Sequence, residues 1–169
     1  MNKKSISILI LVVLIVGGVY LLSDSFISNN RLLGVSHFNN SDISFDYPSI
    51  WIEDKNTNFN LTFRSLFYTM NLDIYDISNT SFEKSIDGFL QDNSNFEVKY
   101  KVLKINETMV DGQKAYDISS NITKNGKQLY QRDLIFESNN KMYIIGFLTN
   151  DFNIINNDFN FVKNSIHFK

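Results

Sequence analysis

The chain has 169 residues, of which 43% are hydrophobic, 14% aromatic and 20% charged, and this composition is typical of a globular domain rather than a disordered or collagen-like chain. It has no cysteine, which excludes a disulfide scaffold, a thiol nucleophile, a thiolate metal site and an acyl-cysteine lipoprotein anchor. The net charge is −2, and without the first 22 residues 14 basic residues remain against 18 acidic ones, a balance that argues against nucleic acid as a partner.

An apolar run near the N-terminus predicts a membrane-spanning helix. Residues 6–22 carry no charge, and as a helix they would be about 26 Å long, the short end of a membrane span. Lys3 and Lys4 before the run, with Asp24 after it, favour a cytoplasmic N-terminus. We therefore expect residues 1–22 to be an uncleaved signal anchor in the cell membrane. The alternative is a cleaved signal peptide, which would leave a secreted protein.

A linker and one domain follow the predicted anchor. Residues 23–36 mix polar and apolar side chains without a helical or alternating period, and we interpret them as a juxtamembrane linker. Residues 37–169 carry regular hydrophobic patterns without an internal repeat. They form the predicted extracytoplasmic domain.

Alternating apolar residues predict the first strands of this domain. One strand runs from Ile43 to Tyr47 and ends at Pro48, which has no N–H to donate to a sheet. Two more strands, over 61–63 and 70–74, lie on either side of a connection. The first half of the domain is therefore expected to contribute antiparallel strands.

The next segment, from Thr80 to Asp92, has the period of a helix. Thr80 and Glu83 have the spacing of a capping box, in which each side chain bonds to the other residue's backbone N–H. Four apolar residues then share one face of the helix: Phe82, Ile86, Phe89 and Leu90. This face should cover a sheet.

The second half of the domain predicts an antiparallel meander. Apolar residues alternate from Phe96 to Val102, and the pattern slips by one place at Leu103, which indicates a β-bulge. Strands from about 104 to 148 should be neighbours in the sheet, because three tight-turn signals separate them: Asp111-Gly112, Asn125-Gly126 and Asn139-Asn140.

A closing helix is predicted from Asp151, which would cap it. Its apolar face would consist of Phe152, Ile155, Phe159 and Val162. Two amphipathic helices beside mostly antiparallel strands define an α+β sandwich, with the sheet flanked by α-helices.

Three stretches carry a resemblance to a known family. Residues 43–51 have the sequence Ile-Ser-Phe-Asp-Tyr-Pro-Ser-Ile-Trp, residues 112–116 have Gly-Gln-Lys-Ala-Tyr, and the chain ends in Ser-Ile-His-Phe-Lys. With the order of helices and strands, the domain resembles the PsbP and Mog1 group over nearly all of residues 37–169. The resemblance implies an α/β/α sandwich and members that act as accessory subunits of membrane complexes or as protein-binding modules rather than as enzymes.

Four residues of the first stretch are candidate interaction or motif residues: Phe45, Tyr47, Pro48 and Trp51. Since Pro48 ends the strand with a fixed backbone angle, Trp51 can fold back and cover one end of the core. The alternative is that Trp51 binds a ligand.

No catalytic residue, metal site or cofactor is predicted. His37 and His167 lie outside any Gly-x-Ser-x-Gly context, zinc lacks its usual ligands, and no glycine-rich loop could hold a phosphate. Two acidic pairs could hold only a hard cation such as calcium, and we interpret them as solvated strand ends: Asp42 with Asp46, and Asp73 with Asp76.

Two surface features bear on partners. A basic strand with Lys99, Lys101 and Lys104 around Tyr100 would contact anionic lipid headgroups, or else form a solvated sheet edge. Joint exposure of several of five aromatic residues would mark an interaction surface: Phe59, Phe67, Tyr68, Tyr75 and Phe147.

The sequence favours a membrane-anchored extracytoplasmic binding or accessory module of a membrane-associated complex. Residues 6–22 would hold it in the membrane, and its partner would be a protein in or at the membrane. An envelope hydrolase with an unfamiliar active site and a purely structural envelope protein are the alternatives.

Overall fold

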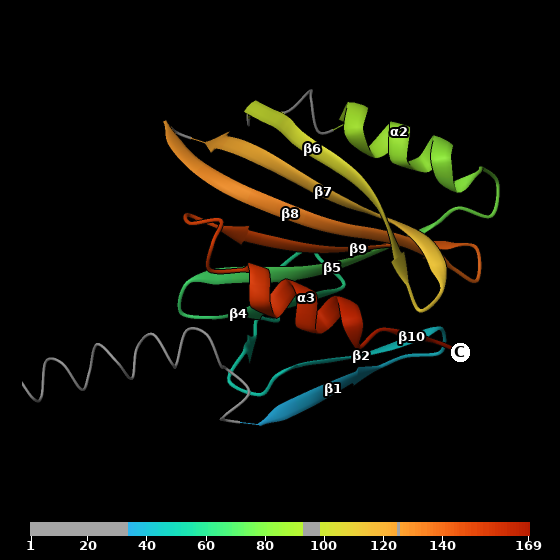
Figure 1. The fold of residues 1–169 in the computed structure, drawn as a ribbon, viewed down its shortest axis with the longest axis horizontal. Helices are drawn as coiled ribbons and strands as arrows, with labels where there is room; N and C mark the ends of the chain where they lie inside the picture. Colours follow the sequence, from blue (N-terminus) through green and yellow to red (C-terminus); the bar gives the residue numbers. More distant parts are fainter. Residues whose placement is uncertain (1–33, 93–98, 125) are drawn as a thin grey trace, which may run out of the picture.

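The computed structural model describes residues 34–92, 99–124 and 126–169. These residues form a seven-stranded sheet, a three-stranded sheet and two helices (Figure 1). The predicted anchor over residues 1–22, and the predicted linker up to residue 33, lie outside the described residues. Within the described ranges, no helix is both long enough and apolar enough to cross a membrane.

Every pair of neighbouring strands in the two sheets is antiparallel. The larger sheet contains, in spatial order, β3 (Ile52–Glu53), β4 (Leu61–Arg64), β5 (Tyr68–Asp76), β9 (Lys141–Thr149), β8 (Lys127–Ser138), β7 (Gln113–Lys124) and β6 (Lys99–Val110). The smaller sheet contains β1 (Val35–Asn39), β2 (Ile43–Pro48) and β10 (His167–Phe168). The predicted α+β class with a mostly antiparallel sheet is confirmed.

Both faces of the larger sheet are covered (Figure 1). Helix α2 (Phe82–Asp92) packs on one face over a small core that includes Ile118, Ile135 and Ile144. Helix α3 (Asn156–Asn164) and the smaller sheet pack on the other face, around the larger core. Because helices lie on both sides, alternate residues of the central strands are buried in opposite directions.

The strands predicted in the first half of the domain are confirmed as β2, β4 and β5, with Pro48 as the last residue of β2. Strand β1 was not predicted. It begins at Val35, within the segment interpreted as linker, and pairs with β2 along its whole length. Phe38 of β1 stacks on Phe45 with their ring centroids 4.8 Å apart.

The first helix is confirmed, but its predicted cap is wrong by one residue. The backbone N–H of Thr80 donates to the Ile77 carbonyl, which places Thr80 in the preceding turn. Ser81 caps the helix instead, since its hydroxyl accepts a hydrogen bond from the Lys84 backbone N–H at 3.3 Å. Phe82 and Ile86 are buried against the sheet, as the spacing predicts.

The meander of β6, β7, β8 and β9 is confirmed, and so is the bulge, because the register of β6 against β7 shifts between Val102 and Lys104. Asp111 and Gly112 have φ angles of 44° and 80°, and Asn139 and Asn140 have 52° and 58°. These left-handed angles are those of tight hairpin turns and explain the residue types found there.

The closing helix starts later than predicted, at Asn156. Asp151 caps a separate turn, where its carboxylate accepts a hydrogen bond from the Asn153 backbone N–H at 3.0 Å. Asn156, the first residue of the helix, is bound by Arg132 of β8, which donates to its side-chain oxygen at 2.8 Å. The predicted buried face is confirmed for Ile155, Phe159 and Val162, whereas Phe152 packs on Tyr130 before the helix begins.

Candidate functional site

The four candidate motif residues lie in and beside the larger core. Phe45, Pro48 and Trp51 are buried and Tyr47 is half-buried. The Trp51 ring lies 6.0 Å from Tyr47 and 5.7 Å from Tyr68, between centroids. These contacts are those of packing residues that close one end of the core, and the backbone N–H of Trp51 donates back to the Pro48 carbonyl at 3.1 Å.

An open cavity of about 680 Å³ lies on the α2 face of the larger sheet. Its walls come from α2, from β5, β8 and β9, and from the segment before β4. Apolar and aromatic side chains form much of the lining: Phe59, Tyr75, Ile77, Phe89, Met142, Ile144 and Leu148. Among the described residues that line the cavity, none is basic.

Asp133 lies beneath the floor of this cavity and is fully buried. The Gln131 side-chain amide donates to both of its carboxylate oxygens, each at 2.8 Å. Burial is the main cause that raises the pKa of Asp133 to about 7, and the charges of Asp117 and Asp73 act in the same direction. This carboxyl group therefore exchanges its proton near neutral pH.

Gly146 of β9 makes room for that carboxyl group. The two residues are partners in the β8–β9 register, and a Cβ atom at position 146 would lie only 2.7 Å from Asp133 Oδ1. Any larger residue would have to displace the carboxylate. Glycine is thus required here by close approach and not by its backbone angles.

Asp73 is the second acidic residue of the cavity. It projects from β5 on the same face as Asn71, and burial raises its pKa above the ordinary value. Phe59 and Tyr75, which lie nearby, are each almost half exposed. The cavity therefore combines an aromatic rim with acidic side chains and no basic residue among its described lining, which suits an apolar group that carries a cation.

The two histidines do not contribute to this cavity. His37 Nδ1 lies 2.7 Å from an Asp46 carboxylate oxygen, and His167 Nδ1 lies 3.5 Å from Asp111. Both imidazoles are largely exposed. A hydrolase site with one of these histidines is therefore not located in this cavity, because neither histidine lines it.

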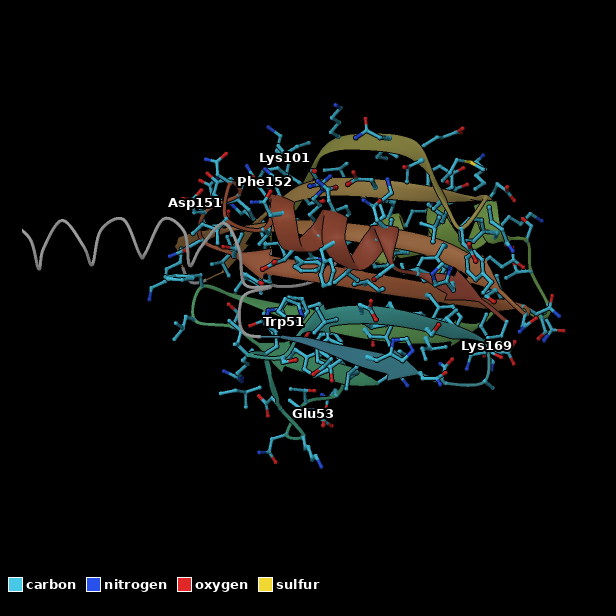
Figure 2. The ribbon with its side chains drawn as sticks, turned by 60° about the horizontal axis from the view of Figure 1, so that its bottom comes forward. Trp51, Glu53, Lys101, Asp151, Phe152 and Lys169 are labelled. Carbon is cyan, nitrogen blue, oxygen red and sulfur yellow. The ribbon has the colours of Figure 1, made fainter. Side chains whose placement is uncertain are left out.

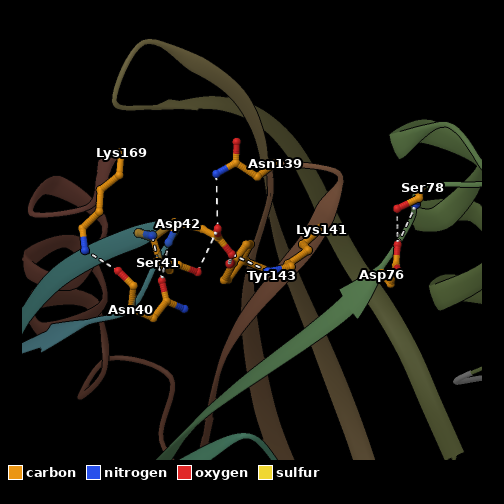
Figure 3. A network of polar contacts seen from close by, with 10 residues as sticks. Asn40, Ser41, Asp42, Asp76, Ser78, Asn139, Lys141, Tyr143 and Lys169 are labelled. Atoms are coloured by element: carbon orange, nitrogen blue, oxygen red, sulfur yellow. Dashed lines mark hydrogen bonds and ion pairs between the residues drawn. The ribbon is translucent and has the colours of Figure 1, made fainter.

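The interpretation of Asp42 as a solvated strand end is wrong. Asp42 is buried and accepts hydrogen bonds from Lys141 Nζ and the Tyr143 hydroxyl, both at 2.7 Å (Figure 3). These partners hold the pKa of its carboxyl group far below the usual range. Asp76, by contrast, is exposed and bonds only locally to Ser78. No group of three or more metal-ligating side chains occurs in the described parts of the chain.

The five aromatic residues considered for a joint surface do not lie together. Tyr68 and Phe147 are buried in the larger core and so take no part in such a surface. Phe59 and Tyr75 line the cavity, whereas Phe67 lies in the β4–β5 connection. The exposed aromatic residues thus belong to two different places.

Asp133, Gly146 and the cavity itself were not predicted from the sequence. Asp133 follows Gln131 by two residues in a strand that continues with Leu134, Ile135 and Phe136. Gln131 and Asp133 point to the same face of the strand, directly before this apolar stretch. That pattern was the only sequence signal for a polar group at this place in the sheet. Strand periodicity alone does not say that a helix covers the polar face as well.

The chain belongs to the PsbP-like protein family, whose model matches residues 6–167. A search of curated proteins by sequence found no match. Three solved structures share the fold, each at low sequence identity.

The cyanobacterial PsbP protein CyanoP of Synechocystis sp. PCC 6803 has a TM-score of 0.63 at 15% identity, over 81% of this chain and 94% of that one. LpqN, involved in cell envelope biogenesis of Mycobacterium tuberculosis, has a TM-score of 0.56 at 10% identity, over 85% and 95%. The Saccharomyces cerevisiae Ran-binding protein Mog1p has 0.55 at 7% identity, over 80% and 95%. The resemblance to the PsbP and Mog1 group is confirmed.

Proposed function

We propose that this protein is a membrane-anchored, extracytoplasmic binding module that serves as a non-catalytic accessory of a membrane-associated complex. The observation that carries the binding role is the open cavity on the α2 face. Its volume of about 680 Å³ is that of a typical ligand-binding site. Its aromatic rim and acidic residues offer recognition to a ligand, and no histidine is found among the described residues that line it.

The chemistry of the lining defines the partner. An apolar side chain would pack against Phe59, Tyr75 and Phe89, and a lysine or arginine beside it would pair with Asp73. A protein segment that places a basic residue next to an aliphatic or aromatic one has both features. We therefore expect the partner to present such a segment to the cavity.

The proposed membrane anchor limits the partner to the region close to the bilayer. The apolar run of residues 6–22 supports a membrane span, and the family match begins at residue 6 and so includes this run. Residues 23–33 would then keep the domain within about 38 Å of the bilayer even when fully extended. A partner at the membrane surface lies within that reach.

The related structures support a binding role in this setting. LpqN is described as involved in cell envelope biogenesis, and Mog1p is described as a Ran-binding protein. At their low identity these proteins share the fold alone, so neither partner is transferred to this chain.

Photo-cross-linking in native membranes tests the proposal. A benzophenone amino acid at Tyr75, on the cavity rim, should join the protein to one reproducible partner. The same group at Asp87, exposed on α2 but outside the cavity lining, is the matched control. Adding Asp73→Lys should remove the Tyr75 product. Equal products from both positions, or a Tyr75 product that persists with Asp73→Lys, would refute binding through the cavity.

A further inference from the structure

The hairpin between β4 and β5 has an apolar tip. The backbone N–H of Ser65 donates to the Tyr68 carbonyl at 2.9 Å, so Leu66 and Phe67 are the two central residues of the turn. Leu66 is 84% exposed and Phe67 is 47% exposed. Glycine, asparagine, aspartate and proline normally occupy such positions.

Other hairpins of this protein follow the usual rule. Asp111-Gly112 joins β6 to β7, Asn139-Asn140 joins β8 to β9, and Gly126 lies between β7 and β8. The chain therefore places two large apolar side chains at a tip where it elsewhere uses small and polar ones. Adjacent exposed apolar side chains of this kind form the type of patch that marks a contact surface.

The tip is held in place by the strands and by α3. Thr149 Oγ1 donates to the Phe67 carbonyl at 3.3 Å, and the Phe67 backbone N–H donates to Ser65 Oγ at 3.4 Å. At the base of the hairpin, the buried Tyr68 hydroxyl donates to the Asp158 carboxylate of α3. Since the tip is already ordered, a contact there would cost little conformational entropy.

The tip lies at the end of the domain where the described chain begins. Figure 1 shows the start of β1 and the β4–β5 connection at the same end. Two contacts place the start of the described chain near the tip in the same way. The Gly34 carbonyl accepts a hydrogen bond from the Ser49 backbone N–H, and Trp51, two residues further on, contacts Tyr68 beside the tip. Ile52, which is 72% exposed, pairs with Arg64 directly before the tip and adds apolar surface.

Basic residues are found at the same end. Lys99 and Lys101 are exposed at the start of β6, and Figure 2 shows Lys101 at the end opposite to Lys169. Asp151 lies at this end as well, and Asp54 pairs with Arg64 at 2.6 Å, so the charge is mixed rather than strongly basic. Apolar contact, and not electrostatic attraction, must therefore dominate.

We infer that the Leu66–Phe67 tip inserts into the interface of the bilayer that residues 6–22 are proposed to span, so that the domain stands with this end on the membrane. The inference rests on the proposed anchor. An apolar pair alone binds a bilayer weakly, but an anchor within about 38 Å supplies a high local concentration of membrane surface. The remaining part of the fold then points away from the bilayer.

A probe at the tip tests this inference in the full-length protein. Because the chain has no cysteine, Leu66→Cys carries a single environment-sensitive nitrobenzoxadiazole label. The matched control is Gln113→Cys, exposed beside the Asp111-Gly112 turn at the opposite end. Both proteins are reconstituted into vesicles of phosphatidylcholine and phosphatidylglycerol, with a spin-labelled lipid as quencher.

We expect both variants to float with the vesicles, and only the Leu66→Cys label to shift to shorter wavelength and to be quenched severalfold. If both variants float but both labels remain equally exposed to water, the inserted tip is refuted, whereas the proposed membrane anchor is not. Failure of both variants to float would overturn the anchor and the inference together. A quenched Gln113→Cys label would also overturn the end-on orientation.

Discussion

Replacement of Asp133 by asparagine should change how the stability of the protein depends on pH. The wild-type carboxyl group is fully buried, and burial raises its pKa to about 7 from an ordinary value of 3.8. Folding therefore favours the protonated form. The variant has no proton to lose at this position and keeps an oxygen that accepts from Gln131.

The sign and the size of the effect follow from proton linkage. Stability from the protonated Asp133 is fully present below pH 3.8 and is lost as the pH rises through about 7. A shift of about three units corresponds to about 4 kcal/mol of unfolding free energy, since one unit is worth about 1.4 kcal/mol. The variant should gain stability relative to wild type over this range and reach its full gain above pH 8.

Urea unfolding at several values between pH 4.5 and 8.5 measures this difference. Asp87→Asn, at an exposed position of α2, removes the same charge without a buried carboxyl group and serves as control. The difference in unfolding free energy between Asp133→Asn and wild type should grow by roughly 3–4 kcal/mol across the range. Parallel curves for the two proteins would refute the assignment of Asp133 as the buried titrating group.

Three further substitutions test the packing around the two sheets. Asp42→Ala should lower the unfolding free energy at pH 7 by about 1–3 kcal/mol, because the buried Tyr143 hydroxyl loses its acceptor. Because the pKa of Asp42 is strongly lowered in the fold, wild type loses this contribution gradually as the pH falls below 3.8, so the difference between the two urea curves should shrink steadily with increasing acidity. Gly146→Ala should cost about 1–3 kcal/mol by displacing the Asp133 carboxylate, and the cost should fall in combination with Asp133→Ala in a double-mutant cycle. Trp51→Ala should cost about 3–5 kcal/mol in thermal melting, because it empties one end of the aromatic core.

Local patterns predicted the elements well where one residue type decides the structure. Pro48 ends β2, and the left-handed angles at Asp111 and Asn139 require the residues found in those turns. The order of the meander follows from its short connections, because neighbouring strands with tight turns must pair.

Boundaries set by contacts across the fold could not be predicted in this way. The first residue of α3, Asn156, is bound by Arg132, which is 24 residues away in sequence. Strand β1 has a weak alternating pattern and is fixed by its pairing with β2 and by Phe38 stacking on Phe45. Local propensity carries no information about such partners.

The acidic cavity likewise could not be predicted from local sequence patterns. Alternation places Gln131 and Asp133 on one face of β8, and a polar face is normally expected to meet water. In this fold α2 packs on the same face of the sheet, and the carboxyl group of Asp133 is fully buried there, which raises its pKa. The helix and the strand were each predictable, but their packing, which creates the site, was not.

The tip and the cavity together predict a dependence of partner binding on membrane orientation. The cavity lies on a face of the larger sheet and the tip lies at its end, so an inserted tip would fix the direction in which the cavity meets a membrane partner. Leu66→Asn should therefore reduce the Tyr75 cross-link severalfold in native membranes while leaving the urea midpoint unchanged, because Leu66 is exposed in the fold. Glu83→Gln, at an exposed position of α2, serves as control and should leave the cross-link intact. An undiminished cross-link with Leu66→Asn would show that the partner is reached without the tip.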